Sequence, residues 1–157
     1  MKSNFQGRGI FRMPEALQLS HDEVRAGLVR ASTTGGRIGD AAKRVAELCL
    51  PHFEHEEEIV FPIFGLLREL ASGTVRPEMA QVLPLVTAFS IWRDSLSDAH
   101  QSIALAIEAL LRAARKEHNR EIAEFAYGLR VHERLEDEVI YPMVPLIGKY
   151  VQEKLGN

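Results

Sequence analysis

Residues 52–62, HFEHEEEIVFP, recur later in the chain as residues 132–142, HERLEDEVIYP. In both stretches a histidine is followed four positions later by a glutamate, and the stretch closes with two β-branched residues, an aromatic residue and a proline. Residues four apart lie on one face of an α-helix, with their Cβ atoms roughly 6 Å apart. The repeat therefore predicts two equivalent helices, each of which presents an imidazole and a carboxylate on one face.

Apolar residues at helical spacing extend from these two stretches over most of the chain. The expected helices cover residues 14–32, 40 to about 70, 77–114 and 117–154, with 33–39 as a connection. Asp40 is a plausible N-cap, and Pro51 should kink its helix. Four amphipathic helices with short links predict an all-α fold, an antiparallel up-down-up-down four-helix bundle. We expect one domain over residues 1–157, with 1–12 poorly structured.

The composition is that of an ordinary globular domain. Among 157 residues, 46% are hydrophobic and 26% charged, and the net charge is −3. This balance gives no reason to expect nucleic acid or an anionic membrane as a partner. No apolar run reaches the roughly 18 residues that cross a bilayer, and the start of the chain does not resemble a signal peptide, so we expect a cytoplasmic protein. The single Cys49 excludes an internal disulfide.

Each predicted helix carries one histidine on its apolar stripe, and two of the helices add a glutamate one turn later. These candidate metal ligands are His21, His52, Glu56, His100, His132 and Glu136. One such histidine alone is more often a hydrogen-bonded core residue, and one such glutamate usually lies at the wet edge of a stripe. A full set that converges from four helices favours a metal, because a buried carboxylate without a partner is costly. Imidazole and carboxylate together suit iron, manganese or zinc.

The two halves of the chain also match outside the repeated stretch. His21 and His100 each have apolar residues three and seven positions further on. The first two helices therefore look like a copy of the last two. Such pseudo-symmetric ligand sets suit a centre with two metal ions.

The chain resembles the hemerythrin-like (HHE cation-binding) family over nearly its whole length. The likeness rests on LSHDEVRAGL at 19–28, HFEHEEEIVFP at 52–62, DAHQSI at 98–103 and HERLEDEVIYP at 132–142. It implies a non-haem centre with two irons per chain, held by the six candidate ligands. In oxygen-carrying members the last carboxylate comes five residues after the histidine, here Asp137. The apolar stripe and the match to Glu56 favour Glu136 instead.

The main departure from the oxygen carriers lies in the third helix. Those proteins have a histidine four residues before the one that corresponds to His100, and here that position is Leu96. Four histidines and two carboxylates remain, two histidines per metal. We expect Leu96 to face the metal that His100 and His132 share.

The resemblance implies a protein that binds or reacts with oxygen, peroxide or nitric oxide in sensing or stress defence. An iron storage or delivery module without turnover is the alternative, and a metal-free bundle that mediates protein contacts is a third possibility. A ferritin-like site is excluded, because no histidine here has a glutamate three residues before it. No general base or nucleophile stands out beyond the site, so no reaction follows from the sequence.

Overall fold

The structure is a computed structural model, which describes residues 11–156. The elements are α1 (Glu15–Thr33), α2 (Gly36–His55), η1 (Glu56–Val60), η2 (Phe61–Leu66), α3 (Leu67–Ala71), η3 (Pro77–Val82), α4 (Leu83–Lys116), α5 (Arg120–Leu135), η4 (Glu136–Ile140) and α6 (Tyr141–Leu155). Of these, η1 and η4 are π-helical, and η2 and η3 are 3₁₀-helical. Residues 1–10, most of the segment expected to be poorly structured, lie outside the described residues.

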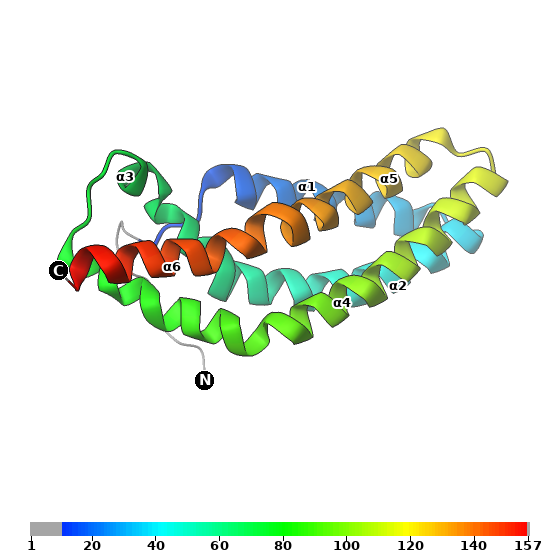
Figure 1. The fold of residues 1–157 in the computed structure, drawn as a ribbon. Helices are drawn as coiled ribbons and strands as arrows, with labels where there is room; N and C mark the ends of the chain where they lie inside the picture. The colour runs from blue at the N-terminus through cyan, green and yellow to red at the C-terminus, as the bar shows by residue number, and fades with distance from the viewer. Residues whose placement is uncertain (1–10, 157) are drawn as a thin grey trace.

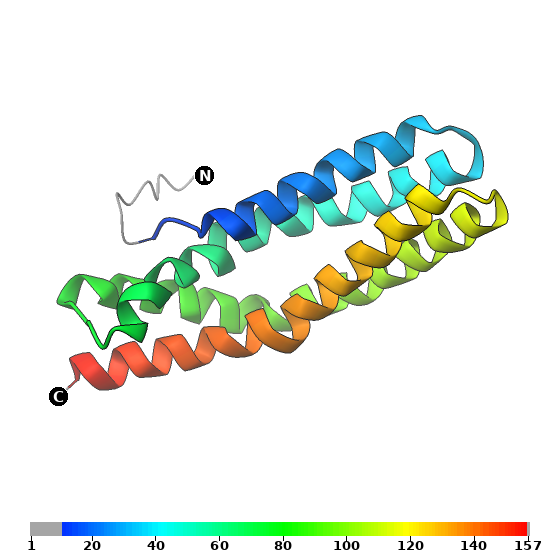
Figure 2. The same cartoon turned by 90° about the horizontal axis from the view of Figure 1, so that it is seen from above.

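Four antiparallel rods form the bundle (Figures 1 and 2). The first rod is α1, the second α2 with η1, the third α4, and the fourth α5, η4 and α6 in one line. The second rod packs against the first and the third, and the fourth packs against the third. The prediction of an all-α, up-down-up-down four-helix bundle is confirmed. None of the helices described is long and apolar enough to cross a membrane.

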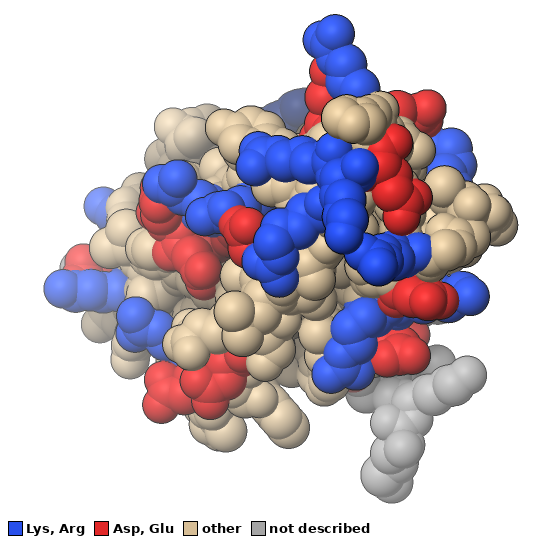
Figure 3. All heavy atoms as spheres, turned by 90° about the vertical axis from the view of Figure 1, so that its right-hand side faces the viewer, with Lys and Arg blue, Asp and Glu red and all other residues tan. Residues whose placement is uncertain are grey.

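Two helix starts differ from those expected. The second helix begins at Gly36 and not after Asp40, because Gly35 and Gly36 adopt φ values of 78° and 56°, and the turn is complete before the predicted cap. The fourth rod begins after Asn119, whose side chain accepts a hydrogen bond from the backbone N–H of Ile122. Where the rods join at this end, Lys and Arg side chains lie among Asp and Glu side chains (Figure 3).

The π-helical segments η1 and η4 interrupt the second and fourth rods at equivalent places in the repeat. The backbone N–H of Phe61 donates to the carbonyl of Glu56, and that of Tyr141 to the carbonyl of Glu136, five residues back in each case. A proline follows each of these aromatic residues. Since proline has no N–H and its ring crowds the carbonyl four residues back, a wider turn before it relieves the clash.

Each π turn adds one residue to the helical register. At the end of the π segments, Val60 and Ile140 lie in the core, whereas Ile59 is only half-buried and Val139 is exposed. A continuous 3.6-residue stripe, as read from the sequence, places Ile59 and Val139 inward instead. The inward face therefore shifts by one position just after the carboxylates of the two motifs.

The apolar core consists of two clusters, one on each side of the polar site. One cluster includes Val45, Ile103 and Leu129, and the other includes Val60, Phe89 and Val144. The candidate ligands lie between the two clusters. Their polar atoms are thus kept from water by apolar layers above and below.

Candidate metal centre

The histidines of the first and fourth rods lie together and define position A. The rings of His21 and His132 have centroids 5.3 Å apart. His21 is fully buried, and the side chain of His132 is 12% exposed. The Nε2 atoms of both rings face Oε1 of Glu136, at 3.4 Å from His21 and 3.0 Å from His132. One nitrogen from each ring and one carboxylate oxygen thus converge within 4.8 Å of one another.

The histidines of the second and third rods define position B. His52 Nε2 lies 2.7 Å from His100 Nε2, and both residues are 4% exposed. Nitrogens that face each other at this distance share at most one proton. Carboxylate oxygens of Glu133 and Glu136 lie in the same group, each 3.4 Å from His100 Nε2.

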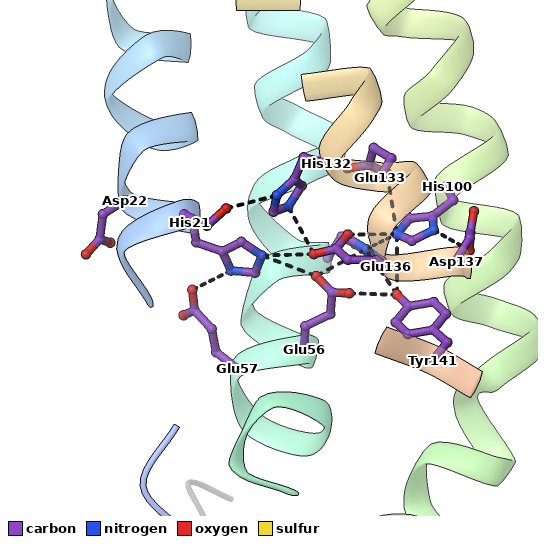
Figure 4. A network of polar contacts seen from close by, with 12 residues as sticks. His21, Asp22, Glu56, Glu57, His100, His132, Glu133, Glu136, Asp137 and Tyr141 are labelled. Atoms are coloured by element: carbon purple, nitrogen blue, oxygen red, sulfur yellow. Dashed lines mark hydrogen bonds and ion pairs between the residues drawn. The ribbon is translucent and has the colours of Figure 1, made fainter. Parts of the chain in front are cut away.

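Glu56 and Glu136 lie between the two positions. Oε2 of Glu56 is 3.4 Å from Nε2 of His21 and 3.4 Å from Nε2 of His52. Glu136 turns Oε1 toward position A and Oε2 toward His100. Each carboxylate therefore reaches at least one histidine of each pair, so each is placed to bridge two ions (Figure 4).

A second pair of carboxylates orients two of the histidines from behind. Glu57 accepts a hydrogen bond from His21 Nδ1, and Asp137 accepts one from His100 Nδ1, both at 2.8 Å. Arg25 in turn donates to Glu57 at 2.7 Å. A proton held on Nδ1 leaves Nε2 free to bind a metal, and such partners fix the ring and raise its basicity. Asp137 thus supports a ligand from outside, while Glu136 faces the centre.

Apolar and aromatic rings close the site. Phe53 stacks on His21 with centroids 3.8 Å apart, and Phe61 lies 4.7 Å from the same ring. At position B, Tyr141 stacks on His100 with centroids 5.2 Å apart, and its hydroxyl donates to Glu56 Oε1 at 2.7 Å. Phe61 and Tyr141 occupy the same place in the repeat, so the two positions have unequal walls.

The carboxylates favour positive charge at the centre. Burial alone would lower the pKa of His21, but nearby carboxylates, foremost Glu136, outweigh it and raise the pKa to about 9. The pKa of His100 is raised to about 9 against the effect of burial in the same way, again chiefly by Glu136. Burial would raise the pKa of Glu56 and Glu136, yet contacts with the histidines hold both pKa values below the usual range. The carboxylates of the site therefore stabilise positive charge among them.

Several buried polar atoms in the described part of the chain have no partner in hydrogen-bond geometry. They are Glu56 Oε2, His132 Nε2, Glu136 Oε2 and both carboxylate oxygens of Glu133. All belong to the two positions. Such atoms are costly in a core unless a cation binds them, and imidazole with carboxylate is a donor set for iron, manganese or zinc. The residues present therefore fit metal ions.

Two surface grooves lead to the centre. One of about 540 Å³ lies between α1 and α5 and reaches Ser20 and His132. The other, of about 390 Å³, lies between α4 and α5 and reaches His100 and Glu133. Each groove is thus lined by at least one residue of the two positions.

Glu133 is the site residue that sequence reasoning missed. It is 4% exposed, and burial, the main cause, raises its pKa to about 8. The predicted stripe ran from Leu129 to His132, whereas the buried stripe runs from Leu129 to Glu133, and His132 lies at its edge. The signal was present, since Glu133 follows Leu129 by four residues and precedes Glu136 by three.

The remaining histidines and the cysteine lie outside the two groups of donors. His55 and His118 are exposed, and Cys49 is fully buried, with its thiol pKa raised mainly by burial. The structure groups His100 with His52 and His132 with His21, and not His100 with His132 as expected. Leu96 lies in the apolar cluster beside position B, with 5% of its surface exposed.

Replacing Leu96 by histidine tests how close this residue lies to position B. Without metal, Leu96→His should lower the free energy of unfolding by roughly 2–4 kcal/mol, because a polar ring replaces a buried aliphatic group. With metal bound, the loss should shrink, since the new ring lies one turn before His100 and can add a ligand. Urea unfolding with and without metal measures both values. An equal loss in the two states would show that residue 96 does not reach the metal.

Comparison with known proteins gives no match to a family model, to a curated protein or to a solved structure. What the chain does is therefore inferred from its own geometry. The decisive features are the burial of the histidines and glutamates, their convergence from four helices, and the spacing of their donor atoms.

Proposed function

We propose that the chain is a hemerythrin-like, non-haem di-iron protein that binds or reacts with oxygen, peroxide or nitric oxide in sensing or stress defence. One observation carries the proposal: histidine and carboxylate donor atoms converge from four helices into two adjacent groups, and several of the buried atoms there have no hydrogen-bond partner. Position A offers His21 and His132, and position B offers His52 and His100. Glu56 and Glu136 reach both positions.

Bound iron would supply the capacity to take up small oxygen- or nitrogen-containing ligands and to change oxidation state. The protein's own groups do the rest. Glu57 and Asp137 hold the proton on Nδ1 of two histidines, so that Nε2 faces the centre. Phe53 and Phe61 keep water from position A, and the hydroxyl of Tyr141 donates to Glu56, one of the shared carboxylates.

The grooves favour a small-molecule ligand over a closed storage site. His132, the most exposed of the four histidines, lines the groove between α1 and α5. A diatomic ligand or a peroxide fits in a groove of about 540 Å³. Storage or delivery of iron without turnover needs no such ligand, and the two functions therefore differ in what the loaded protein binds.

Metal analysis of the native protein tests the proposal. After expression in iron-supplemented medium and purification without chelators, we expect close to two irons per chain, because two groups of donors are present. His52→Ala should lower the iron content, while His55→Ala should not, since His55 is exposed and donates to the carbonyl of Pro51. A folded protein that contains no metal would refute the proposal.

Absorption spectra of the iron-loaded protein then separate the functions. Exposure to oxygen, nitric oxide or azide should change the spectrum if a ligand binds at the centre. A loaded protein that keeps one spectrum with all three, and only releases iron to a chelator, would indicate storage or delivery.

A further inference from the structure

The internal repeat is broken at one site residue. Glu133 in the fourth rod corresponds to Phe53 in the second, as the alignment of 132–142 with 52–62 shows. Both are buried, Glu133 with 4% and Phe53 with 0% of the surface exposed. Each follows the motif histidine directly and precedes the shared carboxylate by three residues. The same place on the helix therefore carries a carboxylate at position B and a phenyl ring at position A.

The carboxylate of Glu133 is aimed into position B. Its Oε2 lies 3.4 Å from Nε2 of His100, and its oxygen, the two imidazole nitrogens and an oxygen of Glu136 lie within 4.8 Å of one another. Donors bound to one ion at roughly 2.0–2.2 Å stand about 3 Å apart. Neither oxygen of Glu133 has a hydrogen-bond partner, although the residue is buried. A metal ion at position B would satisfy it.

Phe53 supplies nothing comparable to position A. Its ring lies against His21 at 3.8 Å and inclined by 16°, and it packs in the apolar cluster on that side of the site. Position A thus has two histidines and the carboxylates that it shares with position B. Position B has the same set plus one carboxylate of its own. Since a carboxylate adds both a ligand and a negative charge, the two positions should differ in affinity for a divalent cation.

We propose that Glu133 is a metal ligand specific to position B, and that position B therefore binds its ion first and more tightly than position A. This inference rests on the proposed function, since it needs a metal centre. It adds an order of filling and a division of roles. The ion at position B would be held by Glu133. The ion at position A would have fewer protein ligands and would lie beside the groove of larger volume, at His132.

The proposal also predicts opposite effects on the free and the loaded protein. In the metal-free protein a buried carboxylate without a hydrogen-bond partner is unfavourable, so its replacement by glutamine should leave the melting temperature unchanged or raise it. In the loaded protein the same replacement removes a ligand and should lower the melting temperature. A purely structural role for Glu133 would lower it in both states.

Titration of the metal-free protein with Mn²⁺, followed by the EPR signal of the free ion, tests the order of filling. We expect two binding events per chain, with dissociation constants at least tenfold apart. Glu133→Gln should weaken the tighter event at least tenfold and leave the weaker one within about threefold. His132→Ala should abolish the weaker event and leave the tighter one, because His132 belongs to position A alone.

Glu138→Gln is the matched control. This variant removes one carboxylate charge, as Glu133→Gln does, but Glu138 pairs with Arg134 and its side chain is 62% exposed. Both Mn²⁺-binding events should therefore stay as in the native protein. Two events of equal affinity in the native protein, or a Glu133→Gln variant that binds like the native protein, would refute the proposed role of Glu133. Neither result would refute the metal centre itself. If the native protein binds no Mn²⁺, iron or other divalent metal, the metal centre itself is refuted and this inference with it.

Discussion

Chelation of the two proposed metals should lower the melting temperature of the protein by roughly 15–30 °C. A ligand that binds only the native state, present at a thousandfold excess over its dissociation constant, stabilises that state by about 4 kcal/mol per site. For a domain of this size, 1 kcal/mol corresponds to roughly 2–4 °C. The effect should be large here because the donor atoms converge inside the core and several of the buried ones have no hydrogen-bond partner.

Thermal unfolding, followed by circular dichroism before and after dialysis against a chelator, measures this shift. Metal content is determined on the same samples, and restored metal should restore the melting temperature. A variant without position A, such as His132→Ala, should show a smaller shift than the native protein. An unchanged melting curve after verified removal of the metal would mean that the site does not couple metal binding to folding.

Glu136→Ala should cost the protein at least one of its two metals. Its carboxylate faces the Nε2 atoms of three histidines, His21 and His132 through Oε1 and His100 through Oε2. It is 2% exposed and belongs to both donor groups. Loss of this carboxylate removes a ligand from both positions at once, so metal content and affinity should fall together.

Asp137→Ala is the comparison that decides between the two neighbouring acids. Asp137 accepts a hydrogen bond from His100 Nδ1, on the side of the ring that faces away from the centre, and its side chain is 45% exposed. Loss of such a partner weakens metal binding roughly 10-fold to 100-fold but leaves the ligand in place. Two metals per chain should therefore remain at saturating concentration. A greater loss from Asp137→Ala than from Glu136→Ala would contradict the assignment of the shared carboxylate.

The sequence was sufficient to predict which four histidines and which two glutamates converge. Their helical spacing and the repeat predict the correct inward face, because the histidine of each motif precedes the π segment and the glutamate is its first residue. The 3.6-residue period therefore still holds from the histidine to the glutamate. His52 and Glu56 illustrate this, since both lie in η1 or before it and both are buried. The choice of Glu136 over Asp137 followed from the same reasoning.

One feature was beyond a reading of one helix at a time, and another was overlooked. The pairing of His100 with His52 depends on which rods are neighbours, and an apolar stripe does not contain that information. The spacing of Glu133 from Leu129 and Glu136 agrees with its inward position, but the stripe was drawn through His132, which lies at the edge of the buried stripe in the structure. A charged residue beside a chosen ligand is easily assigned to solvent.

The π segments divide the second and fourth rods into two parts with different helical registers. In the second and fourth rods, residues before η1 and η4 follow one helical frame, and residues after them follow a frame displaced by one residue. The same residues wound as one regular α-helix would follow a single frame throughout. That helix would turn Tyr141 and its partner Phe61 off the rings they now cover. An uninterrupted α-helix and this arrangement of the centre are therefore alternatives, and the chain has given up helical regularity where its polar donors meet.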